Sequence, residues 1–195
     1  MIKAIIFDCF GVIIADGFRA VLRGLDETKP EARAHIVPLV DKVVNGELGV
    51  KDSSIKISGY LGITHEQWRE MIKSHENKDP KVLDLIKTIH QKYKTAMLSN
   101  VGEGGIEQRF TTEELANCFD VIVASGEVGF IKPQPEIYLL TAKRLGVEPS
   151  ECVFIDDIER FCTAAKGVGM ETILYQDFEQ MKTELEKILA ADPDN

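Results

Sequence analysis

Five short apolar runs alternate with helical patterns along this chain, and this alternation restricts the possible folds more than any other feature. Each run is a few residues long, rich in β-branched or aromatic residues and apolar on both faces: Ile2–Phe7, Thr95–Leu98, Val121–Ala124, Cys152–Ile155 and Thr172–Tyr175. Such runs are typical of parallel strands that helices cover on both sides. The sequence therefore predicts an α/β fold, a doubly wound, Rossmann-like parallel sheet with right-handed crossovers.

Helical patterns follow the later runs. Pro80–Ile89 has apolar residues at helical spacing, with Asp79 as a capping residue and proline in the first turn. A second helix is expected over Pro135–Leu145, and a third over Asp177–Leu189. The polar tail that follows, residues 192–195, is expected to be frayed.

The alternation is interrupted between residues 15 and 78, where no run has the character of a strand and several helical patterns occur instead. We therefore expect two domains. The α/β core comprises residues 1–15 and 79–195, and a small helical domain, residues 16–78, is inserted after the first strand and lies over its carboxyl end.

The bulk composition narrows the range of functions. The net charge of −9 argues against nucleic acid as a partner, because binding a phosphate backbone needs a basic surface. A small anionic substrate remains possible if a lysine or a bound cation balances its charge locally. The four cysteines have no CxxC spacing, and the chain has neither a signal peptide pattern nor an apolar run long enough to span a membrane. We expect a cytoplasmic protein that does not associate with membranes.

Polar residues lie at or shortly after the ends of four of the predicted strands. Ligands of open α/β sheets bind outside the carboxyl ends of the strands, where the strand order reverses. The residues that could meet at this edge are Asp8 after the first run, Ser99 and Asn100 after the second, Lys132 in the loop after the third, and Asp156 and Asp157 at the end of the fourth.

In this order, these residues resemble the four motifs of the haloacid dehalogenase (HAD) superfamily, and the inserted helical segment resembles the C1-type cap of its subfamily I. The resemblance covers nearly the whole chain. It implies a central sheet of strand order 3-2-1-4-5, a dependence on Mg²⁺, and phosphoryl transfer through an aspartyl-phosphate.

The chemistry of phosphoryl transfer suits the residues in this pattern. A carboxylate can attack phosphorus and form a covalent acyl phosphate, and Asp8 is the candidate nucleophile. Lys132 and Ser99 are candidates for holding the charged phosphoryl oxygens, and Asn100 is a candidate for shaping the phosphate pocket.

A divalent cation would relieve the repulsion among the gathered acids. By the resemblance, Asp8, the backbone carbonyl of Phe10 and Asp157 bind the Mg²⁺, and Asp156 either coordinates it too or acts through water. These assignments predict a metal site at the same sheet edge as the nucleophile.

Phe10 departs from the pattern of the phosphatases in the superfamily. Those enzymes have an acid two residues after the nucleophile, whose side chain protonates the leaving group and later activates water. Phe10 retains the backbone carbonyl but cannot transfer a proton, a contribution typically worth about 10²–10⁴-fold in rate.

Three functions follow from this departure. The first is an Mg²⁺-dependent phosphatase that acts on a small phosphorylated metabolite. The second is a 2-haloacid dehalogenase-like hydrolase, because true dehalogenases of the superfamily have an aromatic residue at the position of Phe10. The third is a non-catalytic protein that binds phosphate or metal. The adjacent acids Asp156 and Asp157 favour the phosphatase, since they suit a cation and would repel a carboxylate substrate in a metal-free site.

Overall fold

The computed structural model describes residues 1–44 and 47–191, so the predicted polar tail lies outside the described residues. The chain forms two compact units. The core unit consists of Met1–Ile13 together with the chain from Asp79 onwards, and the inserted unit is Ile14–Lys78. None of the helices in the described ranges combines the length and the apolar character needed to cross a membrane.

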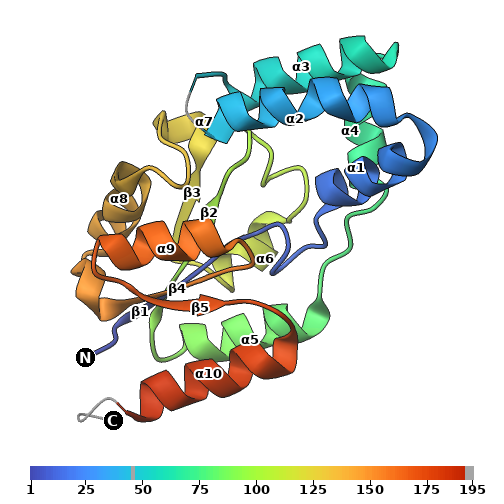
Figure 1. Cartoon of the computed structure of the whole chain (residues 1–195). Helices are drawn as coiled ribbons and strands as arrows, with labels where there is room; N and C mark the ends of the chain where they lie inside the picture. Colours follow the sequence, from blue (N-terminus) through green and yellow to red (C-terminus); the bar gives the residue numbers. More distant parts are fainter. Residues whose placement is uncertain (45–46, 192–195) are drawn as a thin grey trace. The chain divides into compact units, whose positions relative to one another are not determined.

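The core unit is built on a five-stranded parallel sheet with the order β3-β2-β1-β4-β5 (Figure 1). This arrangement confirms the predicted fold class and the strand order 3-2-1-4-5. In the central pairing, Phe7 lies opposite Met97 on one side and Ile155 on the other. The strands are β1 (Ala4–Phe7), β2 (Lys94–Ser99), β3 (Val121–Ala124), β4 (Cys152–Asp156) and β5 (Glu171–Leu174).

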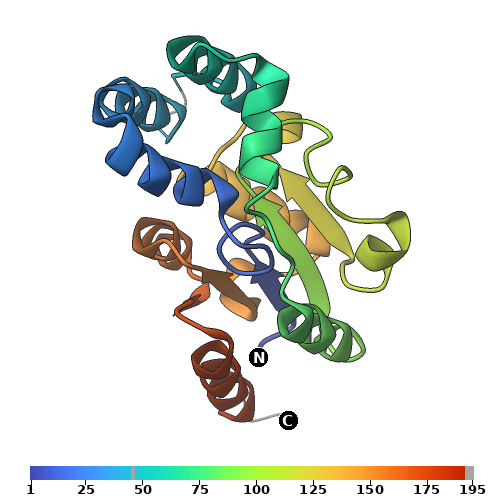
Figure 2. The same cartoon turned by 90° about the vertical axis from the view of Figure 1, so that its right-hand side faces the viewer.

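Helices cover both faces of this sheet, as the double-faced apolar strands require (Figures 1 and 2). On one face lie α5 (Pro80–His90) and α10 (Phe178–Ala190), and on the other lie α8 (Pro135–Leu145) and α9 (Glu159–Gly167). Asp79 caps α5, and Asp177 caps α10 instead of being its first residue. The remaining short elements of the core unit are α6 (Thr112–Ala116), α7 (Ser125–Val128) and the 3-10 turn η1 (Pro149–Glu151).

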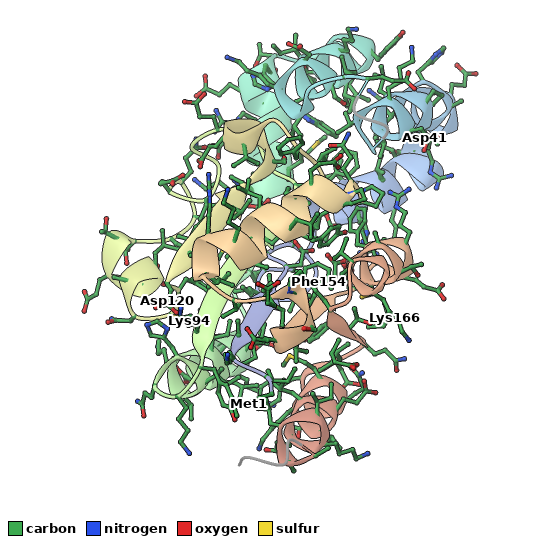
Figure 3. All side chains as sticks on the ribbon, turned by 90° about the vertical axis from the view of Figure 1, so that its left-hand side faces the viewer. Met1, Asp41, Lys94, Asp120, Phe154 and Lys166 are labelled. Carbon is green, nitrogen blue, oxygen red and sulfur yellow. The ribbon has the colours of Figure 1, made fainter. Side chains whose placement is uncertain are left out.

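The core under α8 and α9 is anchored by aromatic side chains. Tyr138 and Phe154 are fully buried and pack edge to face, with ring centroids 5.3 Å apart; Phe154 is labelled in Figure 3. The Tyr138 hydroxyl donates to the carbonyl of Phe161, 3.1 Å away. Burial of one such side chain stabilises the fold by about 1.5–3 kcal/mol. This packing holds the start of α9 against the carboxyl end of β4.

The inserted unit is helical in the part that the structure describes. Its helices are α1 (Gly17–Thr28), α2 (Pro30–Val44), α3 (Val50–Leu61) and α4 (His65–Lys73). They enclose a small apolar core in which Trp68 is 1% exposed and meets Phe18 edge to face at 5.9 Å. The two ends of the unit are joined by an antiparallel bridge between Ile14 and Lys78.

The carboxyl ends of three adjacent strands carry the polar residues singled out above. The backbone N–H of Asp8, directly after β1, donates to the carbonyl of Ile155 in β4 at 2.8 Å. Ser99 is the last residue of β2, and Asp156 is the last residue of β4. Because these strands are parallel neighbours with matched registers, their final residues reach the same edge of the sheet.

Candidate active site

A buried lysine connects two buried carboxylates at this edge. The Lys132 ammonium nitrogen lies 2.7 Å from Asp8 Oδ1 and 2.6 Å from Asp156 Oδ2. The three residues are 1%, 5% and 0% exposed, respectively. Three segments that are far apart in the sequence therefore bring their charged groups into one contact, as we expected for Asp8, Lys132 and Asp156.

The turn after β1 orients the Asp8 carboxylate. Its Oδ1 accepts a hydrogen bond from the backbone N–H of Cys9 at 2.7 Å, in addition to the contact with Lys132. The Cys9 side chain is fully buried and packs in the core. Two donors on one oxygen restrict the rotation of the carboxylate.

Asn100 positions Lys132 through its backbone. The Asn100 side-chain oxygen accepts from the Lys132 N–H at 2.9 Å, and the side-chain nitrogen donates to the Lys132 carbonyl at 2.9 Å. Above the backbone, the Lys132 ammonium lies 5.0 Å from the ring centre of Phe161 and 5.5 Å from that of Phe154. Asn100 thus uses both ends of its amide to fix the loop from which the lysine extends.

Asp156 connects the cluster to the next helix. Its Oδ1 accepts from the backbone N–H of Ile158 at 2.8 Å, just before α9 begins. Its Oδ2 contacts Lys132. The carboxylate therefore has a structural role in the turn and an electrostatic role in the cluster at the same time.

Asp157 completes a group of three acids with Asp8 and Asp156. One oxygen from each of the three lies within 4.8 Å of the others. Gly11 makes room for this arrangement, because a Cβ atom at Gly11 would overlap the Asp157 carboxylate. Its φ of +99° is also in the region that favours glycine. The sequence alone did not reveal this function of Gly11.

Burial dominates the electrostatics of the cluster. Burial, and then the neighbouring charge of Asp156, raise the pKa of Asp8 to about 8, although Lys132 and the Cys9 N–H act in the opposite direction. Burial likewise raises the pKa of Asp156, against the effect of Lys132. For Lys132, burial favours the neutral amine, but Asp8 and Asp156 outweigh it and raise the pKa of the ammonium. The lysine stays charged and balances only part of the negative charge.

The set of donors fits a hard divalent cation. Carboxylate oxygens are the protein ligands that Mg²⁺ prefers, and a cation would remove the charge repulsion that opposes ionisation of Asp8. Asp8, Asp156 and Asp157 can each provide one oxygen within the distances above. The residues present are therefore chemically suited to Mg²⁺.

Ser99 has a buried hydroxyl without a partner. The residue is 0% exposed, and its Oγ is the single buried side-chain nitrogen or oxygen in the described part of the chain that makes no hydrogen bond. Unsatisfied buried polar groups are uncommon in folded proteins and need an explanation. A bound ligand next to the end of β2 would provide one.

Phe10 lies under an arginine that the sequence analysis missed. The Arg109 guanidinium stacks over the Phe10 ring at 4.9 Å, and its Nη1 donates to the carbonyl of Gly105 at 2.8 Å. Phe10 and Arg109 are both half-buried. Arg109 is the sole lysine or arginine between Ser99 and Lys132, a signal that could have drawn attention to it.

Comparisons with known proteins identify a family and several relatives of this chain. The family description "haloacid dehalogenase-like hydrolase" matches residues 2–169. The chain is 26% identical over 183 residues to a phosphorylated carbohydrates phosphatase from Thermotoga maritima, a match that covers 88% of this chain and 83% of that protein. It is 41% identical over 75 residues to the rat bifunctional epoxide hydrolase 2, where the match covers 38% of this chain and 14% of the relative.

Solved structures share the fold. A HAD family enzyme from Bacteroides thetaiotaomicron, crystallised with magnesium and inorganic phosphate, superposes with a TM-score of 0.73 at 21% identity over 93% of this chain and 99% of that one. An L-2-haloacid dehalogenase superposes with a TM-score of 0.68 at 18% identity over 98% of this chain and 100% of that one. The fold is therefore shared by an enzyme crystallised with magnesium and phosphate and by a dehalogenase, and it does not by itself assign the reaction. The family match, which extends over most of the chain, shows that this protein belongs to the haloacid dehalogenase-like hydrolases.

Proposed function

We propose that this hydrolase is an Mg²⁺-dependent phosphatase that cleaves a small phosphorylated metabolite through an aspartyl-phosphate on Asp8. The observation that carries the proposal is the buried contact of Lys132 with Asp8 and Asp156, with Asp157 next to them. A carboxylate that has a lysine and two further acids beside it suits covalent phosphoryl transfer more than it suits a purely structural ion pair.

The relatives support this direction. The Thermotoga maritima protein, whose match spans most of both chains, is a phosphatase of phosphorylated carbohydrates. The Bacteroides enzyme was crystallised with magnesium and inorganic phosphate. Both observations favour a small phosphate ester as the substrate.

In the proposed reaction, the Asp8 carboxylate attacks phosphorus and the bond from phosphorus to the leaving oxygen breaks. Lys132 can donate to a phosphoryl oxygen while it keeps its contacts with Asp8 and Asp156, because an ammonium has three donors. The Ser99 hydroxyl, which has no partner within the protein, would donate a hydrogen bond to the same phosphoryl group. Asn100 contributes by holding the Lys132 loop.

Water then attacks the aspartyl-phosphate, the acyl phosphate bond breaks, and inorganic phosphate leaves with Asp8 regenerated. The carboxylate must be ionised at the start, although burial raises its pKa to about 8 in the metal-free protein. Lys132 lowers that pKa in part, and the remaining negative charge is the reason to expect a cation.

Asp8, Asp156, Asp157 and the carbonyl of Phe10 are the groups that would hold Mg²⁺. When bound, the ion supplies positive charge that balances the acids and the phosphoryl oxygens. The three carboxylates fit this role by their chemistry and proximity. The contribution of the Phe10 carbonyl rests on the resemblance to the family.

The leaving group must depart without a proton from residue 10. Phe10 cannot act as a general acid, which removes a contribution of about 10²–10⁴-fold for poor leaving groups. We therefore expect anomeric sugar phosphates or acyl phosphates to be better substrates than simple alkyl phosphates. The inserted unit would be a C1-type cap that selects among them.

We also propose a cytoplasmic location. All four cysteines, which lie within the described residues, are free and buried. Thiols of this kind suit a reducing compartment.

A 2-haloacid dehalogenase activity is the second candidate, because Phe10 is aromatic and dehalogenases share the fold. In that reaction Asp8 would displace a halide from carbon without a metal. The excess of acids over lysine in the cluster disfavours it, since a 2-haloacid brings another carboxylate. A non-catalytic protein that binds metal or phosphate is the third candidate.

A phosphate ester panel assayed with and without Mg²⁺, beside a 2-haloacid panel with and without chelator, distinguishes the three. The phosphatase predicts phosphate release that requires Mg²⁺ and disappears in Asp8→Asn. Halide release that is insensitive to chelation would establish the dehalogenase instead. Binding of Mg²⁺ or phosphate without turnover, even of activated esters, would indicate lost chemistry.

A further inference from the structure

We propose that Arg109 is a substrate-recognition residue, which selects phosphate esters whose leaving group carries a second negative charge, a carboxylate or a second phosphate. The inference rests on the proposed phosphatase function and narrows its substrate class. It starts from the contact between the Arg109 guanidinium and the ring of Phe10, the residue two positions after the candidate nucleophile.

The first step is the location of the pair relative to the cluster. Asp8 and Lys132 are almost completely buried, whereas Phe10 and Arg109 are half-buried. Phe10 is in the same turn as Asp8, and the next residue, Gly11, has its Cα against the Asp157 carboxylate. A phosphoryl group held at Asp8 leaves the remainder of the ester to extend from the buried cluster towards the surface. Phe10 follows Asp8 by two residues, so the Arg109 guanidinium, which stacks on the Phe10 ring, lies next to the turn that holds the candidate nucleophile.

The second step is that the guanidinium is held in place before a ligand arrives. The Phe10 ring supports one face of it, and the carbonyl of Gly105 accepts from Nη1 at 2.8 Å. A guanidinium has five N–H donors, so it can add a contact with an anion to the contacts that it already makes, the bond to Gly105 among them. Preorganised arginines are well suited to carboxylates and phosphates, because the planar fork matches two oxygens.

The base of the loop that carries Arg109 is also fixed. The Val101 carbonyl accepts from the Gly126 N–H at 2.9 Å and from the Ser125 hydroxyl at 3.2 Å. A Cβ atom at Gly126 would come within 2.6 Å of the Glu103 N, so the two segments are in close contact. A rigid loop lowers the entropy lost when its arginine binds a ligand.

The third step is the balance of charge. When all three acids are ionised, they and Lys132 together carry a charge of −2, which one divalent cation would cancel. A phosphate ester with a second anionic group adds more negative charge than the buried residues can balance. Arg109 is the basic residue that the loop after β2 supplies, and it lies on the ring that replaces the usual acid.

The alternative is that Arg109 has a purely structural role in holding the loop, with Phe10 and Gly105 among its contacts. The two roles differ in what they predict for matched ligands. Replacing a structural arginine changes the affinity for all ligands by a similar factor. Replacing a recognition residue changes the ratio between the affinity for a charged ligand and the affinity for its neutral analogue.

The test measures binding first, because binding does not depend on turnover. The probes are 4-carboxyphenylphosphonate, its neutral carboxamide, and 1,4-phenylenediphosphonate, titrated calorimetrically with Mg²⁺ present. We expect the carboxylate and the diphosphonate to bind wild type about fivefold more tightly than the carboxamide, the effect of one partly exposed ion pair. In Arg109→Gln this ratio should fall to about 1, while the affinity for the carboxamide changes less.

Two further variants keep the test decisive if Arg109→Gln folds poorly. Arg109→Lys retains the charge without the fork and should keep part of the ratio, whereas Phe10→Leu removes the supporting ring and should lower it.

Arg144→Gln is the matched control for loss of one positive charge. Arg144 is exposed near the end of α8, where the Leu145 carbonyl accepts from Lys94 at the start of β2, on the opposite edge of the sheet; Lys94 is labelled in Figure 3.

The second measurement is kcat/KM for 4-carboxyphenyl phosphate and 4-carbamoylphenyl phosphate. Wild type should prefer the carboxylate, and Arg109→Gln should lose that preference while Arg144→Gln keeps it. The inference is overturned if wild type binds the carboxylate and the carboxamide equally well. It is also overturned if wild type prefers the carboxylate and Arg109→Gln keeps that preference. Absence of turnover combined with an arginine-dependent binding ratio rejects the phosphatase instead and leaves the recognition role of Arg109 standing.

Discussion

Two buried hydroxyls on the same strand have opposite environments. Thr95, near the start of β2, donates to the Cys118 carbonyl at 2.6 Å and contacts Nδ1 of His90 at 2.7 Å. Since the Thr95 hydroxyl gives its one hydrogen to Cys118, the His90 nitrogen must carry the hydrogen of the second bond. Ser99, at the end of the strand, is equally buried and has no partner.

The contrast extends to the charges at the two edges of the sheet. At the amino edge, Asp120 accepts from the Thr95 N–H at 2.8 Å and remains 44% exposed; it is labelled in Figure 3. At the carboxyl edge, Asp8 is buried beside another acid, and its pKa rises to about 8. Polar groups at the amino edge satisfy one another, whereas at the carboxyl edge the Ser99 hydroxyl has no hydrogen-bond partner and the Asp8 carboxylate is buried beside another acid. An unsatisfied hydroxyl at the same edge as a buried charge cluster is a sign of a ligand site.

The largest effect that would test this contrast is loss of the nucleophile. Asp8→Asn should lower phosphatase turnover by at least about 10⁴-fold, because the amide cannot form the acyl phosphate. Steady-state rates with an activated ester such as p-nitrophenyl phosphate measure it. Asp120→Asn changes an acid at the amino edge of the sheet. It should leave the rate within a factor of about 2, because Asp120 is partly exposed and lies away from the site. Residual turnover near wild type in Asp8→Asn would remove Asp8 from the reaction.

A second test restores the acid that the sequence lacks. Phe10→Asp should increase kcat for alkyl phosphates by about 10–100-fold, at or below the low end of the range for general acid catalysis because the new side chain is not preorganised. The rate with p-nitrophenyl phosphate, whose leaving group needs no proton, should change far less. An equal gain for both esters would mean that Phe10 affects something other than proton transfer.

The two hydroxyls themselves provide the third test. Ser99→Ala should raise KM for a phosphate ester by about 5–10-fold, the effect of one hydrogen bond worth about 1 kcal/mol, and change the free energy of unfolding by less than about 0.5 kcal/mol. Thr95→Val should do the reverse, with a loss of about 1–2 kcal/mol in unfolding free energy and unchanged kinetics. Chemical denaturation and steady-state kinetics on both variants measure these four quantities. If Ser99→Ala destabilises the fold as much as Thr95→Val, the hydroxyl has a structural partner after all.

The last test concerns the pH dependence of stability in the metal-free protein. The pKa of Asp8 is about 8 in the fold against 3.8 for the ordinary side chain, so the folded state holds this proton more tightly. Its stabilising contribution is present below about pH 4 and is lost as the pH rises towards 8. Asp8→Asn does not titrate there.

The melting temperature of Asp8→Asn should therefore rise relative to wild type between pH 5 and pH 8 in EDTA. A shift of about 2–4 °C is expected for each 1 kcal/mol in a chain of this size. Added Mg²⁺ should reduce the difference by stabilising wild type. A difference that does not change with pH would show that Asp8 ionises normally in the fold.

Much of this molecule follows from local sequence patterns. Apolar runs such as Val121–Ala124, which are β-branched on both faces, indicate parallel strands wherever they occur, and β3 has those bounds. Pro135–Leu145 followed by Gly146 became α8 with the glycine as its left-handed cap. These features depend on backbone preferences within a few residues. The resemblance to the HAD motifs then supplied the strand order and the expectation that Asp8, Lys132 and Asp156 meet.

The contacts that give the site its chemistry were decided by the tertiary structure. Asn100 hydrogen-bonds the backbone of Lys132, and Gly11 has no side chain that would overlap Asp157. The Arg109 guanidinium stacks on the Phe10 ring. Each of these pairs joins segments that are far apart in sequence. Whether they touch depends on strand register and loop path, which no local pattern encodes. The sequence by itself determined the strands, the helices and the kinds of residue at the sheet edge; only packing in three dimensions decided which of those residues satisfy one another and that Ser99 is left without a partner.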